Sequence, residues 1–449
     1  MFDEVLARFE AHAPLSVMMR LALERAMPAG WIDEVFETAR QRQYPRELLF
    51  STVVKLTSLV SLGLRPSLHA AAKKEAELPV SIAALYDKVR RTEPAILSKL
   101  VQESACRLAP VVEAMGLSQS LPGWDLRVVD GNHLPSSEKR LAPLRGCRGA
   151  ALPGHTLVVY DADRGLVTDI VGCEDAHAQE RAVMGPLLER AQPGQLWMAD
   201  RNFCTRDIAQ GWQRAGAGFI VREHAKHPRL IEQGPWVACG RVETGLLREQ
   251  AIGIEAGQPP WRRIELQLDE PTEDGETVLW LWSNLPQSVS AQQIARLYRK
   301  RWRIEGMFQR LESVLHSEIR SLGHPRAALL GFAVAILAYN VLHLLKHSVE
   351  QAHRQQLPQL DVSTYYIAVD LRAEYEGMLI ALPAEAWQSW SDATPRDIAD
   401  RLLELARRLN PKRLATHKRG PKIKKPRGYV SAAVARSHLS TARVLAMAG

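Results

Sequence analysis

Apolar residues recur at three- and four-residue spacing through the first 120 residues, which is the periodicity of amphipathic helices. The clearest stretches are VFETARQRQYPRELLFSTVVKLTSLVSL and AILSKLVQESACRLAPVVEAM. Between them, a turn over residues 77–79 separates two shorter helices, and Ser81 is a typical N-cap for the second. The pattern therefore predicts an all-helical region over residues 1–120 that contains a candidate helix-turn-helix.

From Leu126 onward, short apolar runs alternate with turns. RVVDGNHL, QLWMAD and GFIVRE are typical of strands, and HTLVVYDADRGLVTDIVG is typical of a hairpin. Helical stretches, QERAVMGPLLERA and TRDIAQGWQRAG, separate the later strands. The order strand, hairpin, helix, strand, helix, strand predicts a sheet with three antiparallel members followed by crossover connections. This is the element order of the RNase H-like fold.

Residues 224–278 interrupt that order. They are rich in Gly and Pro and contain strand-like pieces such as LREQAIGIE, so they predict a β-rich insertion. The scaffold resumes at TVLWLWSNLP, and Ser290 with Gln293 makes a capping-box pattern at the start of a helix. Residues 327–342 are almost uninterrupted apolar sequence but contain an Asn and have His and Arg at their flanks, which favours a core helix over a membrane span.

The predicted fold class is α/β, with an RNase H-like mixed sheet flanked by helices, a β-rich insertion and an all-helical N-terminal domain. The predicted boundaries are 1–120 for the N-terminal DNA-binding domain, 121–223 and 279–350 for the two parts of the catalytic core, 224–278 for the insertion, 351–410 for a helical C-terminal region and 411–449 for a basic arm.

The formal net charge of +8 favours a polyanionic partner, nucleic acid first and an acidic membrane second. Residues 412–427 hold eight Lys or Arg and no Asp or Glu, so this segment equals the entire excess. A solvated tail is the alternative explanation of such a run. The DNA contacts expected from this arm are Lys418, Arg419, Lys422, Lys424 and Lys425.

The candidate recognition helix of the N-terminal region is also basic. It presents Lys88, Arg90 and Arg91, which we expect to contact DNA, with plain helical packing as the alternative. The five cysteines are scattered and never occur as Cys-x-x-Cys, which argues against a zinc cage and suits a reducing cytoplasm. The sequence has no GxxxxGK[ST] motif, so we expect no nucleotide cofactor.

Three acidic residues occupy positions from which they can converge. Asp130 ends one strand, Asp200 ends a later strand, and Glu305 lies on the helix after the insertion. Convergent carboxylates at a strand edge are the hard oxygen ligands that Mg²⁺ or Mn²⁺ requires. Two such ions, roughly 3.5 to 4 Å apart, would support an in-line displacement at phosphorus.

Glu305 is the one carboxylate in IARLYRKRWRIEGMF, which otherwise carries four arginines and a lysine. At about 100° per residue, Tyr298 and Arg301 share its face of the helix. A neighbouring stripe is apolar: Ile304, Phe308, Leu311 and Leu315. Metal binding by Glu305 among DNA-binding arginines explains this composition. The alternative is an amphipathic helix whose Glu305 only pairs with Arg301 four residues away.

The spacing of Tyr298, Arg301 and Glu305 resembles the Tyr-Arg-Glu-Lys signature of DDE transposases from bacterial insertion sequences of the IS-four family. VVDGNHL around the first acid and ADRNF around the second are also similar to that family. EIRSLGHPRAALLGFAVAILAYNVL resembles the segment after the signature. The resemblance covers residues 120–350 well and both ends of the chain more loosely.

This resemblance implies that Asp130, Asp200 and Glu305 form a catalytic triad that binds two Mg²⁺ or Mn²⁺ ions. It also implies that Tyr298 and Arg301 contact DNA near the cut. Trp280, in the strand before the signature helix, matches an aromatic that stacks on a flipped base during hairpin formation. Trp282 alternates to the opposite face and is the weaker candidate, and a strand tryptophan taken alone is more often a core residue.

The sequence departs from the family at one position. Where the family has a lysine seven residues after the catalytic acid, this chain has Glu312. A lysine there would bind phosphate and a glutamate would repel it, so Arg310 or Arg320 would have to compensate from another part of the helix face.

The resemblance implies a transposase that hydrolyses transposon ends, forms and opens a hairpin, and joins the ends to target DNA. The implied partners are double-stranded DNA at inverted repeats, target DNA and a second copy of the chain in a homodimer, with no membrane. The implied location is the bacterial cytoplasm, at the nucleoid. The alternatives are a structure-specific or domesticated nuclease and a catalytically inactive DNA-binding derivative.

Overall fold

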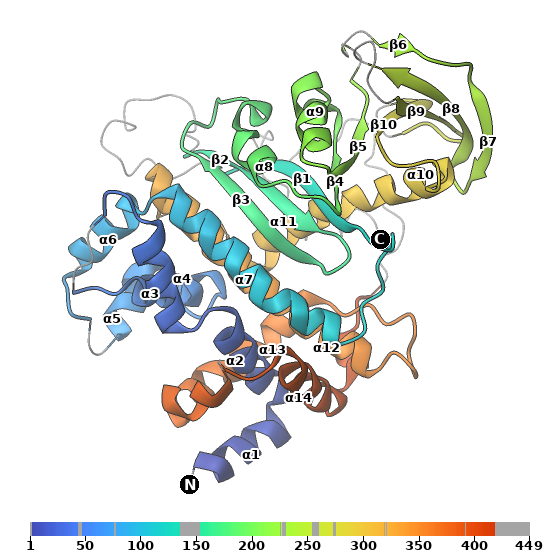
Figure 1. Cartoon of the computed structure of the whole chain (residues 1–449). Coiled ribbons are helices and arrows are strands. Elements are labelled where there is room, and N and C mark those ends of the chain that lie inside the picture. Colours follow the sequence, from blue (N-terminus) through green and yellow to red (C-terminus); the bar gives the residue numbers. More distant parts are fainter. Residues whose placement is uncertain are drawn as a thin grey trace, which may run out of the picture. The chain divides into compact units, whose positions relative to one another are not determined.

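The computed structural model describes residues 2–43, 47–75, 78–134, 153–224, 226, 230–253, 260–272, 275–317, 319, 321–390 and 392–417. Residues 1–415 form one compact unit (Figure 1). The predicted DNA contacts Lys418, Arg419, Lys422, Lys424 and Lys425 lie outside the described residues and stay predictions, as do the predicted domain boundaries.

A mixed sheet of ten strands organises the chain, in the order β3-β2-β1-β4-β5-β10-β9-β8-β6, with β7 also paired to β8. Strand β1 is antiparallel to β2 and parallel to β4, and β4 is parallel to β5. This is the order and direction of an RNase H-like sheet, so the predicted fold class is confirmed. The strands are β1 Asp125–His133, β2 His155–Asp161, β3 Leu166–Cys173, β4 Gln195–Ala199, β5 Gly218–Arg222, β6 Ile231–Glu232, β7 Val237–Val242, β8 Gly245–Gly253, β9 Trp261–Leu268 and β10 Val278–Ser283.

The insertion is β-rich, as predicted, and its strands continue the central sheet. Strand β10 pairs antiparallel with β5 on one side and with β9 on the other, and β8 follows β9. The free edge of β5 therefore becomes an interior position of a longer sheet. One ladder of backbone hydrogen bonds runs from the hairpin β2–β3 to the insertion.

Helices cover both faces of this sheet and form the rest of the compact unit (Figure 1). The predicted helical character of the N-terminal region is confirmed, and the Ser81 hydroxyl caps α6 by accepting a hydrogen bond from Ala84 N at 3.2 Å. The helices are α1 Phe2–His12, α2 Pro14–Ala26, α3 Ala29–Ala39, α4 Phe50–Ser61, α5 Leu68–Lys74, α6 Ile82–Arg91, α7 Pro94–Ala114, α8 Gly185–Glu189, α9 Arg206–Arg214, α10 Ala291–Arg299, α11 Arg303–Leu315, α12 Pro325–Ala352, α13 Thr364–Ala381, α14 Pro395–Arg407 and α15 Pro411–Leu414, with 3-10 turns η2 Glu180–Val183, η3 Arg201–Phe203, η4 Lys300–Trp302 and η5 Ala384–Trp390.

Two expected helices are divided in the structure. QERAVMGPLLERA forms the turn η2 and then the short helix α8, because Pro186 lacks the N–H that a continuous helix needs and instead occupies the first turn of α8. The helix that begins at Ser290 has the predicted capping box. It passes through the 3-10 turn η4 between α10 and α11, so the signature residues are spread over three successive segments.

Two apolar layers pack against the sheet, because alternate strand residues point to opposite faces. Val128 belongs to the layer that includes α7 and α12, and Val129 belongs to the layer under α8 and α9. Helix α12 is the predicted core helix. Within the part of the chain that the structure describes, it is the one helix long and apolar enough to cross a membrane, and 89% of its most apolar window is buried inside the protein.

The polar residue of α12 has a clear structural role. Asn340 is fully buried, and its side chain accepts a hydrogen bond from Val167 N and donates one to Val167 O, both at 2.8 Å. These two bonds satisfy the backbone of β3 next to an irregularity in its pairing with β2. The asparagine therefore fixes α12 against the sheet that carries the acidic residues.

Candidate active site

The first acid, Asp130, lies on β1, on the face of the sheet that α11 covers. It pairs with Val158 of β2, and its carboxylate accepts a hydrogen bond from Gly131 N at 2.9 Å. Residues 128 and 130 point to the same side of the strand, and Val128 lies in the apolar layer that also contains Ile304 of α11. The prediction that Asp130 ends its strand is wrong in detail, because β1 continues to His133 in its pairing with β2.

The second acid, Asp200, follows the last residue of β4, which is parallel to β1. Because the two strands run in the same direction side by side, their carboxyl ends meet at one edge of the sheet. Asp200 caps the turn η3 by accepting a hydrogen bond from Asn202 N at 2.8 Å. The first and second acids thus lie on neighbouring strands.

Arg301 links the first acid to the third. Its Nη1 atom lies 3.3 Å from Asp130 Oδ2, and its Nη2 atom lies 3.2 Å from Glu305 Oε1. The ion pair between Arg301 and Glu305, which the alternative hypothesis expected, is present. It does not account for the arrangement, because the same guanidinium also holds a carboxylate from β1. Glu305 and Asp130 therefore converge on a single buried cation.

The charges at this edge are incompletely balanced. Burial raises the pKa of the Asp130 carboxyl group to about 7; Arg301 and the Gly131 N–H lower it, whereas the charges of Asp200 and Glu180 raise it. Asp130 and Glu305 share the Arg301 guanidinium, and Asp200 lies at the same edge of the sheet, where its charge acts on Asp130.

The other arginines of the signature segment have partners within the protein. Arg296 and Arg299 both pair with Glu243, at the turn between β7 and β8, at 2.9 and 3.3 Å. Arg303 Nη1 donates to the carbonyl of Ala162 at 2.7 Å. The segment is thus tied to the insertion through α10 and to the β2–β3 hairpin through α11. Contacts of these arginines with DNA would have to replace or share these partners.

Tyr298 is buried beneath the guanidinium of Arg301, with 6.0 Å between the ring centroid and the guanidinium carbon. Burial raises the pKa of Tyr298 to about 12, so its hydroxyl group stays neutral at physiological pH. The guanidinium carbon also lies 5.1 Å from the ring centroid of Trp302, which is 61% exposed. Trp302 was not singled out from the sequence, although its place next to Arg301 was a usable signal.

The two tryptophans of β10 differ as their alternation predicted. Trp282 is fully buried among the aromatic rings of the layer under α9, and its Nε1 atom donates to Glu223 at 2.7 Å. Trp280 is 36% exposed, and its Nε1 atom donates to Glu265 Oε2 at 3.0 Å. Trp280 is therefore partly exposed and has an oriented ring, while Trp282 is a core residue.

A second aromatic of the insertion, which the sequence analysis missed, lies near Trp280. The guanidinium carbon of Arg263 is 5.7 Å from the Trp280 ring and 5.8 Å from the ring of Trp236. Arg263 is held by two hydrogen bonds to Glu223, at 2.6 and 2.5 Å. Trp236 follows a loop with no strand periodicity, so the sequence carried no local signal for this arrangement.

The predicted contacts on α6 have protein partners as well. Arg90 and Arg91 are exposed and both pair with Asp87. Lys88 donates to the carbonyl of Leu48, and its Nζ atom lies 4.7 Å from the ring centroid of Phe36. Helix α5 packs on α4 and α6 packs on α12. DNA reading by α6 stays a prediction, carried by Arg90 and Arg91 more than by Lys88.

Glu312, at the position of the family's lysine, is exposed on α11. The charge of Arg310 acts on the buried phenols of Tyr339 and Tyr160. Compensation by Arg310 for the missing lysine stays a prediction. Arg320, the other candidate, lies outside the described residues.

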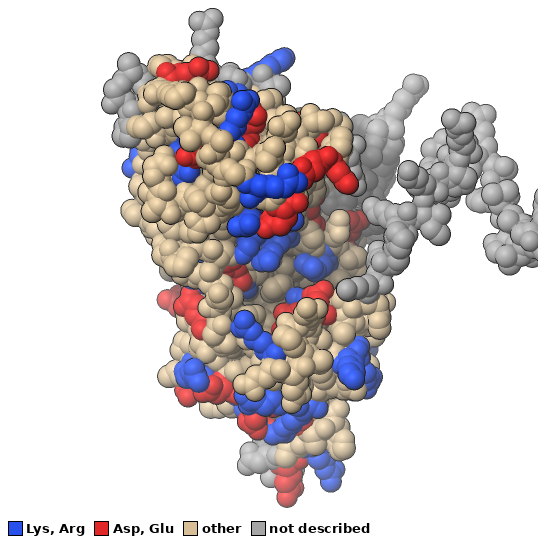
Figure 2. All heavy atoms as spheres, turned by 90° about the vertical axis from the view of Figure 1, so that its right-hand side faces the viewer, with Lys and Arg blue, Asp and Glu red and all other residues tan. Residues whose placement is uncertain are grey.

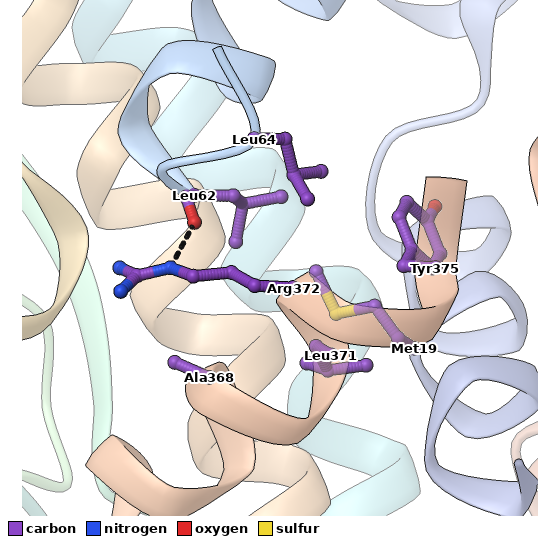
Figure 3. A pocket seen from close by; sticks show the side chains of 7 residues that line it. All are labelled: Met19, Leu62, Leu64, Ala368, Leu371, Arg372 and Tyr375. Atoms are coloured by element: carbon purple, nitrogen blue, oxygen red, sulfur yellow. Dashed lines mark hydrogen bonds between the residues drawn. The ribbon is translucent and has the colours of Figure 1, made fainter. Parts of the chain in front are cut away.

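The described residues contain no group of three or more His, Cys, Asp or Glu side chains positioned to hold a metal ion. At the three acids, the Arg301 guanidinium contacts two of the carboxylates. A small apolar pocket elsewhere is lined by Met19, Leu371 and Tyr375 among others, and it offers no carboxylate (Figure 3). On the face that Figure 2 shows, basic and acidic side chains are interspersed.

Comparisons with known proteins agree with the site in one respect. Residues 128–341 match the family model described as "Transposase DDE domain", and this range contains all three acids. A comparison with curated proteins gives no match. A solved structure of a piggyBac transposase synaptic complex with hairpin DNA is 10% identical, with 92% of this chain and 88% of that chain covered and a TM-score of 0.37, which is too low to support an argument. Residues 128–341 of this chain are thus similar to transposase DDE domains, and Asp130, Asp200 and Glu305 lie within the matched range.

Proposed function

We propose that the protein is a DNA transposase that cuts and joins transposon ends by metal-dependent phosphoryl transfer. The observation that carries the proposal is that Asp130 and Glu305 share one buried guanidinium and Asp200 lies at the same edge of the sheet, inside a segment that matches transposase DDE domains. The assignment to the IS-four family rests on the signature residues and is part of the proposal.

The acids fit a divalent cation by charge and by ligand chemistry. Carboxylate oxygens are the ligands that Mg²⁺ and Mn²⁺ prefer, and the raised pKa of Asp130 reflects negative charge that Arg301 does not fully balance. Asp130, Asp200 and Glu305 would hold two ions. When bound, such ions activate the attacking oxygen and stabilise the leaving oxygen of an in-line displacement at phosphorus.

The residues of the chain have separate tasks in this reaction. Asp130 must lose its proton to bind a cation, and Arg301 must release at least one carboxylate. The released guanidinium, which lies close to the rings of Tyr298 and Trp302, could donate hydrogen bonds to a phosphate and hold it in a bidentate manner. The same acids serve hydrolysis, hairpin formation and strand transfer, because each step is a displacement at phosphorus.

Trp280 is the proposed platform for a base displaced when the hairpin forms. Its ring is partly exposed, and its indole nitrogen is held by Glu265, so the ring is already oriented before a base arrives. Stacking of a base on an aromatic ring contributes about 1 to 3 kcal/mol, which offsets part of the cost of unpairing it. The pairing and cutting of two transposon ends calls for a homodimer at inverted repeats, in the bacterial cytoplasm.

The test is incubation of the purified full-length protein with a radiolabelled transposon end in Mn²⁺, followed by a denaturing gel. We expect a hairpin product from the wild type and from Glu189→Gln, an exposed acid on α8, and none from Glu305→Ala. Nicking without a hairpin or joined product would instead indicate a structure-specific nuclease. A stable complex that never cleaves would indicate an inactive DNA-binding derivative.

A further inference from the structure

Helix α10 carries a basic stripe that leads to the candidate active site. Its exposed residues are Gln293, Arg296 and Arg299, which share the side of the helix turned away from the core, and α10 contains no acid. Arg299 lies six residues before Glu305, which is about 10 Å along the helical segments α10, η4 and α11. A DNA strand bound at the three acids is therefore within reach of both arginines.

One acid of the insertion binds both arginines of the stripe. Glu243 Oε1 accepts a hydrogen bond from Arg296 Nε at 2.9 Å, and Glu243 Oε2 accepts one from Arg299 Nη1 at 3.3 Å. Each carboxylate oxygen thus contacts a different guanidinium. A phosphate group also offers separate oxygens to neighbouring arginines, so the same two guanidinium groups match a phosphate of the DNA backbone.

The backbone of the insertion holds Glu243 in this position. Glu243 and Thr244 form the two-residue loop of the β7–β8 hairpin. The carbonyl oxygen of Thr244 accepts a hydrogen bond from Asp269 N at 3.1 Å, directly after β9. A methyl group built on Gly245 would overlap a backbone oxygen of β9, so the hairpin lies tightly on that strand. A short turn, fixed to the sheet, therefore presents the acid to α10.

The two ion pairs contribute little to the attachment of α10. The side chains of Arg296, Arg299 and Glu243 are 53%, 54% and 56% exposed, and exposed ion pairs add little to stability. The opposite side of α10 supplies the attachment, because Ile294 and Leu297 are buried in an apolar layer that also includes residues of β7 and β8 (Figure 1). Glu243 thus adds little to the fold, while it neutralises part of the positive charge of the stripe.

We infer that Arg296 and Arg299 form a subsite for a phosphate of the DNA backbone, and that Glu243 is the resident anion that the phosphate displaces. The inference deepens the proposed function and rests on it. Binding of DNA at this subsite must break two ion pairs and leave the carboxylate of Glu243 near a phosphate. Glu243 therefore lowers the affinity of the DNA-free protein for DNA.

The inference is tested by titrating a fluorescein-labelled DNA duplex of mixed sequence with full-length protein in EDTA and measuring fluorescence anisotropy. Glu243→Gln keeps the size of the side chain and removes its charge. We expect this variant to bind the duplex about three- to tenfold more tightly at about 0.1 M salt, and the slope of its salt dependence to be steeper by up to about 0.9. Unchanged or weaker binding would overturn the inference.

Glu404→Gln is the matched control for the change in net charge. Glu404 on α14 is another exposed acid that pairs with two arginines, Arg401 and Arg408, at 2.5 and 2.6 Å. The control should bind the duplex as the wild type does. Equally tighter binding by Glu404→Gln and Glu243→Gln would show that the overall charge decides the affinity, and the subsite would be refuted.

A variant with both Arg296→Gln and Arg299→Gln supplies a second, independent test. It should bind the duplex more weakly than the wild type, and adding Glu243→Gln to it should change the affinity less than about twofold. If Glu243→Gln strengthens binding as much without the two arginines as with them, Glu243 repels DNA from a distance and the inference is overturned.

Cleavage by the wild type separates this inference from the proposed function. If the wild type cleaves a labelled transposon end and Glu243→Gln binds DNA no more tightly, the subsite is refuted and the transposase remains. A wild type that binds no DNA refutes both. Melting temperatures close to that of the wild type, expected because the ion pairs are exposed, confirm that each variant is folded.

Discussion

Asp130 and Glu265 are acids on strands of the same sheet, and their pKa values are shifted in opposite directions. Burial raises the pKa of Glu265, but hydrogen bonds from Arg248 and Trp280 outweigh it, so the pKa lies below its usual value. Arg248 binds both oxygens of Glu265, at 2.7 and 2.8 Å. Asp130 has a longer contact to an arginine that it shares with Glu305, and its pKa rises to about 7.

Glu265 is an acid with a structural role, whereas the charge of Asp130 is only partly balanced by other groups of the protein. Glu265 has a complete set of donors and fixes the indole of Trp280. Asp130 faces two further carboxylates and only part of one guanidinium. Since buried charges are normally paired, a buried acid without full compensation is a candidate functional group, which agrees with the role proposed for Asp130.

The largest expected effect is on catalysis. Asp200→Asn and Glu305→Gln should each lower DNA-end cleavage at least about 1,000-fold, because each removes a ligand from cations that contribute several kcal/mol to the transition state. Glu265→Gln should keep cleavage within about tenfold of the wild type. Single-turnover cleavage of a labelled end measures all three variants. Equal losses of cleavage rate would show that Glu265 does not differ in role from Asp200 and Glu305.

The next effect is on cation affinity as a function of pH. Asp130 is protonated below its pKa of about 7, and a cation must displace that proton. We expect Mn²⁺ affinity to be constant above pH 7 and to fall about tenfold per unit as the pH drops from 7 toward 5. Titrations at pH 5.5, 6.5 and 7.5 measure this. A constant affinity over that interval would contradict the raised pKa.

A smaller effect is expected at the aromatic platform that Glu265 supports. Trp280→Ala should lower the yield of hairpin relative to nicked product about tenfold, since it removes a stacking contribution of about 1 to 3 kcal/mol. Trp280→Phe keeps a ring and should recover most of the yield. If both variants nick and form hairpins like the wild type, Trp280 does not act as a stacking platform. The contact of Glu265 with Trp280 then has a structural role only.

The smallest effects are on stability, and they have opposite signs. The raised pKa of Asp130 in the folded state contributes stability that is fully present below about pH 4 and is lost as the pH rises to 7. Deprotonated Asp130 therefore destabilises the fold at neutral pH. Asp130→Asn in EDTA should raise the melting temperature at pH 8 by about 2 to 5 °C and change it little at pH 4.

Glu265→Gln should lower the melting temperature at pH 8, because it weakens the paired hydrogen bonds to Arg248. Thermal melts followed by circular dichroism at pH 4 and pH 8 measure both variants. A fall in melting temperature for Asp130→Asn at pH 8 would show that this acid, too, stabilises the metal-free fold.

Local sequence patterns predicted much of the fold, and together with the family resemblance they named the residues of the candidate site. Strand ends, a hairpin and a capping box gave the RNase H-like order, and alternation separated Trp280 from Trp282. The i,i+4 pair of Arg301 and Glu305 was also visible in the sequence. These features depend on residues close together in the chain, where periodicity and spacing carry the signal.

The missed features all depend on contacts between distant segments. Arg301 reaches Asp130 across 171 positions, and Glu180 meets Gly131 only because η2 folds back over β1. Likewise, Arg296 and Arg299 were expected to hold DNA, but in this structure they pair with Glu243 of the insertion. No periodicity encodes such pairs, so three-dimensional packing was needed to find them.

The continuous sheet also fixes the lateral distance between the strand that precedes Asp200 and the strand that carries Trp280. Between β4, which Asp200 directly follows, and β10, which carries Trp280, there is one intervening strand, β5. Two strand spacings of about 4.8 Å set a lateral offset of about 10 Å that hydrogen bonds keep constant. Measured against the 3.4 Å rise of a DNA strand, that offset corresponds to about three nucleotides. The backbone ladder would thus select, by length alone, which nucleotide beside the cut is available for stacking.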